Sequence, residues 1–174
     1  MEKTISSRRL HEGRHFSFYV DEVELPGGRK TERDIVKHPG AVAIVPVLSD
    51  GRVVLVRQYR YAAEKNLLEI PAGTLEPGET VEECVRRELR EETGYEAGEI
   101  RRLLSCFMAP GYSSEVIHFY IARDLVEVGG APEPDEEIGI EVLDLKKVRE
   151  LIAENVIEDA KTIIGILSLD ERYI

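Results

Sequence analysis

The sequence predicts an α+β fold in which hairpin-connected strands pack against a small number of helices. The chain has 174 residues, 43% of them hydrophobic, which suits one compact domain with a substantial core. Short apolar segments bounded by Gly- and Pro-containing turns are typical of strands. A capped helical segment lies in the middle of the chain, and two more helical segments close it. Runs of strands with few helices indicate a mixed α+β sandwich.

Turn residues and prolines set the limits of the expected strands. Pro26–Arg29 forms a turn, so the strands on either side of it are expected to pair as a hairpin. The tight turn at 49–52 similarly makes the strand after it the hairpin partner of the strand before it. Pro46 lies inside a strand and indicates a bulge or an edge, and Pro71 ends a short strand. The expected strands are residues 15–25, 31–38, 41–48, 52–61, 67–73, 99–108, 115–123 and 138–145.

The central helix has clear signals at both ends. Thr80 is the expected N-cap, because Glu83 three residues later completes a capping-box pattern. The helix should run to about Thr93, with Gly94 in the left-handed conformation at its C-terminus. The closing helices are expected at about 145–154 and 158–170, the second capped by Asp159.

Two glutamates of the central helix lie on its apolar side. At about 100° per residue, Glu88 and Glu92 fall within roughly 20–40° of the stripe formed by Val81 and Val85. Glu91 lies one position further round. A solvated acidic face is the usual interpretation of a Glu-rich helix. Core-facing carboxylates, however, cost several kcal/mol unless a cation compensates them.

These acids predict a divalent-metal site. Oxygen ligands spaced at i, i+3 and i+4 suit Mg²⁺, with Mn²⁺ as the alternative. Arg87 and Glu79 are placed to pair with each other and to brace the helix against the loop before it.

Composition excludes several classes of protein. The net charge of −11 disfavours nonspecific nucleic-acid binding, although a bound cation would still allow a phosphorylated substrate. No apolar run approaches the length of a membrane span, and residues 1–16 lack the apolar core of a signal peptide. We therefore expect a cytoplasmic protein with no membrane partner. Cys84 and Cys106 are isolated, which indicates small buried hydrophobic residues rather than a disulfide.

The segment GTLEPGETVEECVRRELREETGY, residues 73–95, resembles the signature of the Nudix hydrolase family. The matching residues are Gly73, Glu79, Arg87, Glu88, Leu89, Glu91, Glu92 and Gly94, with Tyr95 a mild departure at the last, variable place. The resemblance implies an α/β/α sandwich around a mixed sheet, and hydrolysis of nucleoside diphosphates linked to another moiety.

Further segments resemble the ADP-ribose pyrophosphatase branch of that family. They include VRQYRY, EIPAG, the late DEE and DAKT motifs, and Pro110, which lies sixteen residues beyond Gly94. The resemblance implies Mg²⁺-dependent conversion of ADP-ribose to AMP and ribose 5-phosphate. The alternatives are other ADP-sugars, dinucleotides or oxidised nucleotides as substrates, or a non-catalytic domain that senses ADP-ribose.

The resemblance also assigns roles to individual residues. It implies that Glu88 and Glu92 bind metal, with Glu91 as a third ligand and the main-chain carbonyl of Ala72 as another. The catalytic base is expected in the acidic loop at 129–139. Glu136 is the first choice for this base and Glu137 the second; a solvated acidic loop is the competing interpretation.

Substrate contacts and assembly are implied in the same way. Arg57 and Arg60 cannot face the same side of one strand, and the resemblance implies that Arg60 is the one that contacts the phosphates. The expected substrate-binding residues are Arg33, Arg60, Thr74, Ser114 and Glu115, with surface salt bridges as the competing interpretation for the arginines. Relatives pair through N-terminal strands, so we expect a homodimer, with residues 1–38 for dimerisation and residues 39–174 as the hydrolase domain.

Overall fold

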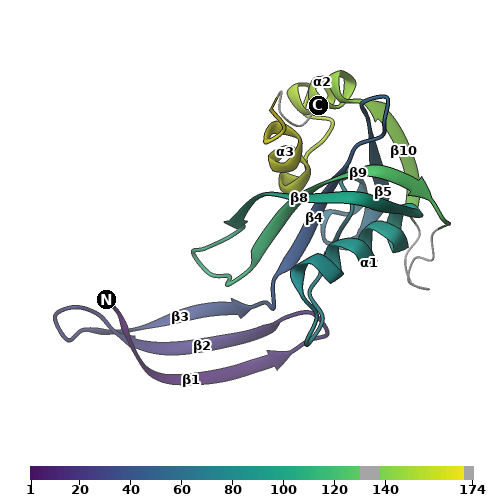
Figure 1. Cartoon of the computed structure of the whole chain (residues 1–174). Coiled ribbons are helices and arrows are strands. Elements are labelled where there is room, and N and C mark those ends of the chain that lie inside the picture. Colours follow the sequence, from purple (N-terminus) through teal and green to yellow (C-terminus); the bar gives the residue numbers. More distant parts are fainter. Residues whose placement is uncertain (130–137, 171–174) are drawn as a thin grey trace.

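The computed structural model describes residues 1–129 and 138–170 and shows sheets flanked by helices (Figure 1). The strands are β1 (Lys3–Glu12), β2 (Ser17–Glu24), β3 (Lys30–Lys37), β4 (Ala41–Pro46), β5 (Arg52–Arg60), β6 (Lys65–Glu69), β7 (Ala72–Thr74), β8 (Tyr95–Phe107), β9 (Val116–Glu127) and β10 (Ile138–Asp144). The helices are α1 (Val81–Thr93), α2 (Leu145–Ala153) and α3 (Ala160–Leu167), with a short 3₁₀ turn at Tyr61–Ala63.

The body of the molecule contains a mixed sheet with the strand order β7-β4-β9-β8. Within it β4 and β9 run parallel, whereas β7 and β8 pair antiparallel to their neighbours. A second sheet has the order β10-β5-β6 and is antiparallel. The chain passes from the second sheet to the first at Ile70 and Pro71, between β6 and β7. Strand β6 ends at Glu69, two residues before Pro71, where the sequence predicts the end of the strand.

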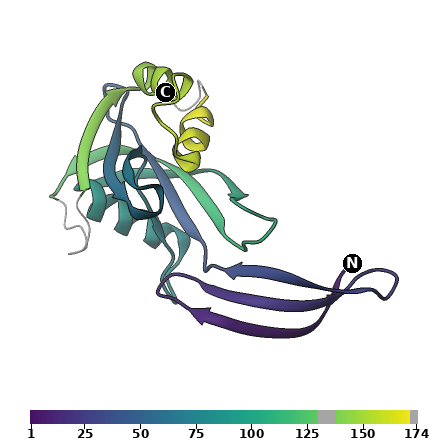
Figure 2. The same cartoon turned by 180° about the vertical axis from the view of Figure 1, so that it is seen from behind.

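Helices cover both faces of the mixed sheet, which confirms the α/β/α sandwich. On one face, Val42 and Ile44 of β4 pack with Cys84, Val85 and Leu89 of α1, and these side chains are fully buried. On the opposite face, β4 and β9 pack against α2 and α3 in a larger apolar cluster. Figure 2 shows the same layers from behind. Of the described helices, none combines the length and apolar character that crossing a membrane requires.

The expected hairpin between the strands at 41–48 and 52–61 is wrong. The turn between them forms, because Gly51 and Leu48 are hydrogen bonded and Leu48 pairs with Arg52. Beyond a single bridge between Val47 and Val53, however, the strands separate into different sheets. The reason is that β9 pairs with one edge of β4 along residues 41–46, whereas on the other edge β7 pairs with residues 41–43 and Pro71 accepts from the backbone N–H of Ile44. Pro46 lies beyond the segment that pairs with β7, where its missing N–H removes no bond.

The N-terminal strands form a separate sheet, β1-β2-β3, that extends away from the body (Figure 1). Strand β1 was not expected from the sequence, because every one of its residues is exposed and none carries a burial pattern. Hydrogen bonds fasten this sheet to the loop before β9. Val36 donates to the carbonyl of Tyr112 over 2.8 Å and accepts from Ser114 over 3.0 Å.

The ends of α1 confirm the predicted caps. Thr80 and Glu83 form the capping box, and Gly94 adopts a φ of 73°. Strand β8 starts directly after this glycine, four residues before the expected start at 99. Asp159 likewise caps α3 by accepting from the backbone N–H of Thr162.

Candidate functional site

A cavity of about 700 Å³ lies where α1, β7 and the end of β5 meet. The inner side of α1 contributes Glu88, Glu91 and Glu92 to its wall. Arg60, at the end of β5, and residues 72–79, which run from β7 into the loop before α1, provide the rest of this part of the lining. A volume of this size suits a nucleotide-sized ligand.

Two of the acids are buried, as their place on the helical wheel predicts. Glu88 is 9% exposed and Glu92 is 6% exposed. Glu92 accepts a hydrogen bond from the backbone N–H of Ala72 over 2.9 Å. The carboxylate of Glu88 lies directly against Gly73, since a Cβ at that position would stand 1.7 Å from Glu88 Oε1. Gly73 is therefore required for space, because any side chain would occupy the place of the carboxylate.

Arg87 holds the acidic residues and the loop together, which agrees with the predicted pairing with Glu79. Its Nε and Nη2 donate to the two carboxylate oxygens of Glu79 over 2.8 and 3.0 Å. Its Nη1 contacts Glu88 over 2.6 Å and Glu91 over 3.2 Å. The bond from Arg87 lowers the pKa of Glu79 to about 2. In turn, the bond to Glu79 raises the pKa of Arg87.

The donor set fits a hard divalent cation. Glu88, Glu91, Glu92 and Ala72 line one cavity and offer oxygen atoms, which Mg²⁺ and Mn²⁺ prefer. Across residues 1–129 and 138–170, no three Asp, Glu, His or Cys side chains already converge on one point. Because Arg87 holds both Glu88 and Glu91 in this arrangement, a cation at these carboxylates would compete with Arg87 for them.

Arg60 reaches the same cavity from the second sheet. Its Nε and Nη2 donate to the two carboxylate oxygens of Glu69, over 2.8 and 2.7 Å. The bond to Glu69 raises the pKa of Arg60. Arg57 lies on the other face of β5, where it pairs with Glu141 over 2.5 Å. The expectation that Arg57 and Arg60 face different sides is therefore confirmed.

Of the expected substrate-binding residues, Arg60 and Thr74 line the cavity and three others do not. Arg33 lies on β3 and is held by Glu2 over 2.6 Å. Ser114 accepts from the backbone N–H of His38 over 2.9 Å, and Glu115 lies 3.9 Å from the ring of the same histidine. Glu136 and Glu137, expected to supply the catalytic base, lie outside the described residues.

The structure adds Arg14 and His15 to the cavity, and the sequence analysis missed both. They lie in the turn between β1 and β2, which comes beside the loop before α1 in both views (Figures 1 and 2). Their adjacent basic side chains are a weak signal by themselves. The unpredicted strand β1 is what brings this turn to the cavity.

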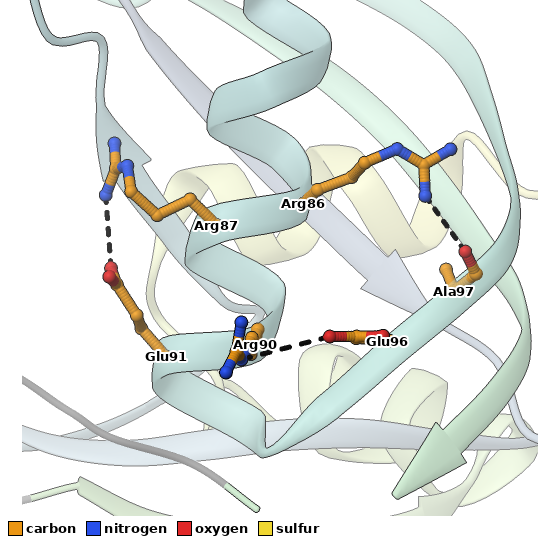
Figure 3. A pocket seen from close by; sticks show the side chains of 6 residues that line it. All are labelled: Arg86, Arg87, Arg90, Glu91, Glu96 and Ala97. Atoms are coloured by element: carbon orange, nitrogen blue, oxygen red, sulfur yellow. Dashed lines mark hydrogen bonds and ion pairs between the residues drawn. The ribbon is translucent and has the colours of Figure 1, made fainter. Parts of the chain in front are cut away.

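A second cavity, of about 620 Å³, lies on the outer side of α1 (Figure 3). Arg86 donates to the carbonyl of Ala97 over 2.9 Å, and Arg90 lies 3.9 Å from Glu96. The guanidinium groups of Arg86 and Arg87 point to opposite sides of the helix (Figure 3). Because these cations diverge, the outer cavity is not arranged to hold one anion.

Two family models match consecutive parts of the chain. Residues 37–164 match the family model of the NUDIX domain, and residues 2–36 match that of the nucleoside diphosphate sugar hydrolase N-terminal domain. The chain is 41% identical to a methanol dehydrogenase activator from Bacillus methanolicus, over 95% of this chain and 90% of that protein. It is 39% identical to an ADP-ribose pyrophosphatase from Bacillus subtilis (strain 168), over 92% of this chain and 88% of that protein.

A solved structure described as an ADP compounds hydrolase has the same fold. It superposes with a TM-score of 0.84 at 24% identity and covers 96% of this chain and 91% of its own. The NUDIX model spans α1 with its glutamates, β7 and the Arg60 end of β5, which together form most of the cavity wall. On this match and on the two relatives near 40% identity, the chain belongs to the Nudix family.

Proposed function

We propose that this chain is a metal-dependent hydrolase that cleaves the diphosphate of ADP-ribose to AMP and ribose 5-phosphate. The observation that carries the proposal is the cavity itself, in which three acids of α1 share a wall with Arg60. Such a cavity suits a diphosphate held between a metal ion and a guanidinium. The name of the Bacillus subtilis relative supports ADP-ribose as the substrate.

Glu88, Glu91, Glu92 and the carbonyl of Ala72 are the proposed ligands for Mg²⁺, with Mn²⁺ as the alternative. When bound, such an ion neutralises charge that develops on the diphosphate oxygens during displacement at phosphorus. The buried positions of Glu88 and Glu92 support this assignment, because two desolvated carboxylates on one helix favour a bound cation. Arg87 keeps the set ordered through Glu79, which anchors it to the loop.

The remaining roles follow from the chemistry of hydrolysis. A base removes a proton from the attacking water as its oxygen bonds to phosphorus and the bridging oxygen leaves with the other half of the substrate. We assign that base to Glu136 first and to Glu137 second. Arg60 and the backbone of Thr74 are the proposed contacts for the diphosphate, and both line the cavity.

The test is a substrate panel with Mg²⁺, scored by release of AMP or the corresponding mononucleotide. It contains ADP-ribose, another ADP-sugar, GDP-mannose, an adenine dinucleotide and an oxidised nucleotide. We expect ADP-ribose to be turned over most efficiently, and Glu92→Gln to lower its kcat/KM by about 100-fold or more. Glu82→Gln is the matched control, because Glu82 is exposed on the same helix.

The panel also separates the alternatives. Faster turnover of another nucleotide than of ADP-ribose would reassign the substrate. GDP-mannose is in the panel because the chain is 38% identical, over 135 residues, to a GDP-mannose pyrophosphatase from Salmonella typhimurium. ADP-ribose binding without turnover of any member would favour a sensing role. If the Glu136→Gln variant keeps full activity, the role of catalytic base is reassigned to Glu137.

We also propose that the chain is cytoplasmic and forms a homodimer through residues 1–38, with residues 39–174 as the hydrolase domain. The extended β1-β2-β3 sheet supports the dimer, because Ile5 and Leu10 of β1 and Phe16 in the turn after it are exposed apolar side chains. In such a dimer Arg33 would reach the substrate of the partner subunit, and Ser114 and Glu115 are the proposed contacts for the terminal ribose or a metal-bound water. Light scattering tests the assembly, and a monomer at micromolar concentration would contradict it.

A further inference from the structure

A buried carboxylate stands behind Arg60. Glu69, at the end of β6, is 1% exposed. Both of its oxygens are bonded to Arg60, and Lys161 of α3 donates to Oε2 as well. Burial acts to raise the pKa of Glu69, but the bonds and charges of Arg60 and Lys161 outweigh it and lower that pKa. The bonds to Arg60 and Lys161 therefore favour the ionised form of Glu69.

The first turn of α3 fixes this group to the strand that leads into the cavity. Lys161 lies 3.1 Å from Asp159, the N-cap residue of α3. Thr162 donates through its hydroxyl to Asp159 over 2.6 Å and accepts from the backbone N–H of Ile70 over 2.8 Å. The helix thus holds Glu69 and Ile70, the two residues immediately before Pro71 and β7. A shift of α3 would therefore move Lys161 relative to Glu69, and through Glu69 it would reach Arg60.

The geometry leaves Arg60 suited to an anion. Glu69 takes its Nε and Nη2, so an arriving phosphate would meet Nη1, and the side chain is 38% exposed to the cavity. Two acids, Glu69 and Asp159, and two cations, Arg60 and Lys161, together carry no net charge, while Glu92 of α1 also acts on Arg60. Lys161 is what balances the second negative charge. Its loss would leave a net negative charge behind Arg60 and weaken the attraction of an anion.

We propose that Glu69 and Lys161 are positioning residues, which hold the guanidinium of Arg60 in the cavity wall at the orientation and net charge that the substrate's diphosphate requires. This inference rests on the proposed function, and it adds the first turn of α3 to the substrate-binding machinery. It also assigns different tasks to the two ion pairs of β5. Arg60 with Glu69 acts on substrate, whereas Arg57 with Glu141, exposed on the other face, does not.

The test compares Lys161→Met and Glu69→Gln with Glu141→Gln, the matched control that breaks the ion pair on the opposite face of β5. For Lys161→Met we expect KM for ADP-ribose to rise about tenfold with kcat within about twofold of the wild type. Lys161→Arg should restore most of the affinity, because it keeps the charge. Glu69→Gln should raise KM further, and Glu141→Gln should leave both constants unchanged.

A double-variant cycle separates positioning from a merely structural role. Lys161→Met added to Arg60→Ala should raise KM no further, because the residue it positions is already gone. Additive effects on KM would overturn the proposal. So would a Lys161→Met protein that shows lower stability to urea but an unchanged KM. The KM of Glu69→Gln is compared only if the circular dichroism spectrum of this variant matches that of the wild type. If it does not match, the KM of Lys161→Met decides the test.

Binding of ADP-ribose in EDTA, measured by calorimetry, distinguishes the two proposals. If the wild type binds ADP-ribose in EDTA but does not hydrolyse it when Mg²⁺ is supplied, the proposed reaction fails. The positioning role is then judged by whether Lys161→Met weakens that binding about tenfold. If the wild type neither binds nor hydrolyses it, both proposals fail. Equal binding by the wild type and Lys161→Met would overturn the positioning role alone.

Discussion

The acidic and basic sides of the cavity are built in different ways. The acidic side lies on α1, and Arg87, which braces it, comes from the same thirteen-residue helix. The basic side joins Arg60, Glu69 and Lys161, and the last two lie 92 residues apart in the chain. One side therefore depends on helical periodicity, and the other depends on how β5, β6 and α3 pack. Substitutions can test each side separately.

The largest effect should come from Gly73→Ala, which displaces an acid without unfolding the protein. The new Cβ would stand 1.7 Å from Glu88 Oε1 and 1.8 Å from its carboxyl carbon, so the side chain must move. Because the atoms in its way belong to the end of a flexible side chain, stability should change little. A displacement of this kind should lower kcat/KM about 100-fold, measured with ADP-ribose and Mg²⁺.

Gly111→Ala provides the control for this substitution. A Cβ at Gly111 would meet no atom within 4 Å, and Gly111 does not line the cavity. It should retain activity and a wild-type melting temperature. Full activity in Gly73→Ala would show that the position of Glu88 does not limit the reaction, and that the acidic side tolerates more movement than its burial suggests.

The acidic side was predictable because its signals are local. The spacing of Glu88 and Glu92 against Val85 needs only the helical period, and the capping box and Gly94 mark the helix ends. The hairpin between 41–48 and 52–61 was wrong for the opposite reason. Which edges of β4 are free is decided by β7 and β9, which come later in the chain.

The basic side and the N-terminal sheet gave weaker signals. Glu69 interrupts an apolar segment, LLEIPAG, and a buried acid there is a hint of a partner cation, but nothing local identifies Lys161. Strand β1 is exposed along its whole length, so it lacks the alternation that reveals a half-buried strand. Because β1 was not predicted, the position of Arg14 at the cavity could not be predicted either.

A smaller effect should appear in the pH dependence of stability on the acidic side. The pKa of Glu79 falls from 4.5 to about 2 in the folded state. A lowered pKa adds stability that is complete above pH 4.5 and is lost as the pH falls toward 2. Glu79→Gln should therefore cost about 2 kcal/mol near pH 7, and progressively less below pH 4.5. Urea unfolding at several pH values measures this difference.

The matched control is again Glu82→Gln, since Glu82 is exposed on the same helix. It should change stability little at any pH. A gap between wild type and Glu79→Gln that stays constant from neutral pH to about pH 2.5 would contradict the prediction. The bond between Arg87 and Glu79 would then not be what orders the loop before α1.

The smallest effect should come from Gly165→Ala, and it acts on the basic side. Gly165 lets α3 approach the sheet, and a Cβ there would stand 2.8 Å from Ile70 Cδ1 and 3.1 Å from Val45 Cγ2. Overpacking costs about 1–3 kcal/mol, whereas alanine gains about 1 kcal/mol of helix propensity. The net loss of stability should therefore be about 1 kcal/mol, measured by urea unfolding.

The same substitution should raise KM for ADP-ribose more than it changes kcat, because pushing α3 away from Ile70 also moves Lys161 away from Glu69. Leu167→Ala, at a 60% exposed position of the same helix, should leave KM unchanged. If Gly165→Ala instead lowers kcat at constant KM, the displacement passes through Ile70 and Pro71 to Ala72 and the acidic side. The two sides of the cavity would then be coupled through the start of β7 rather than held independently.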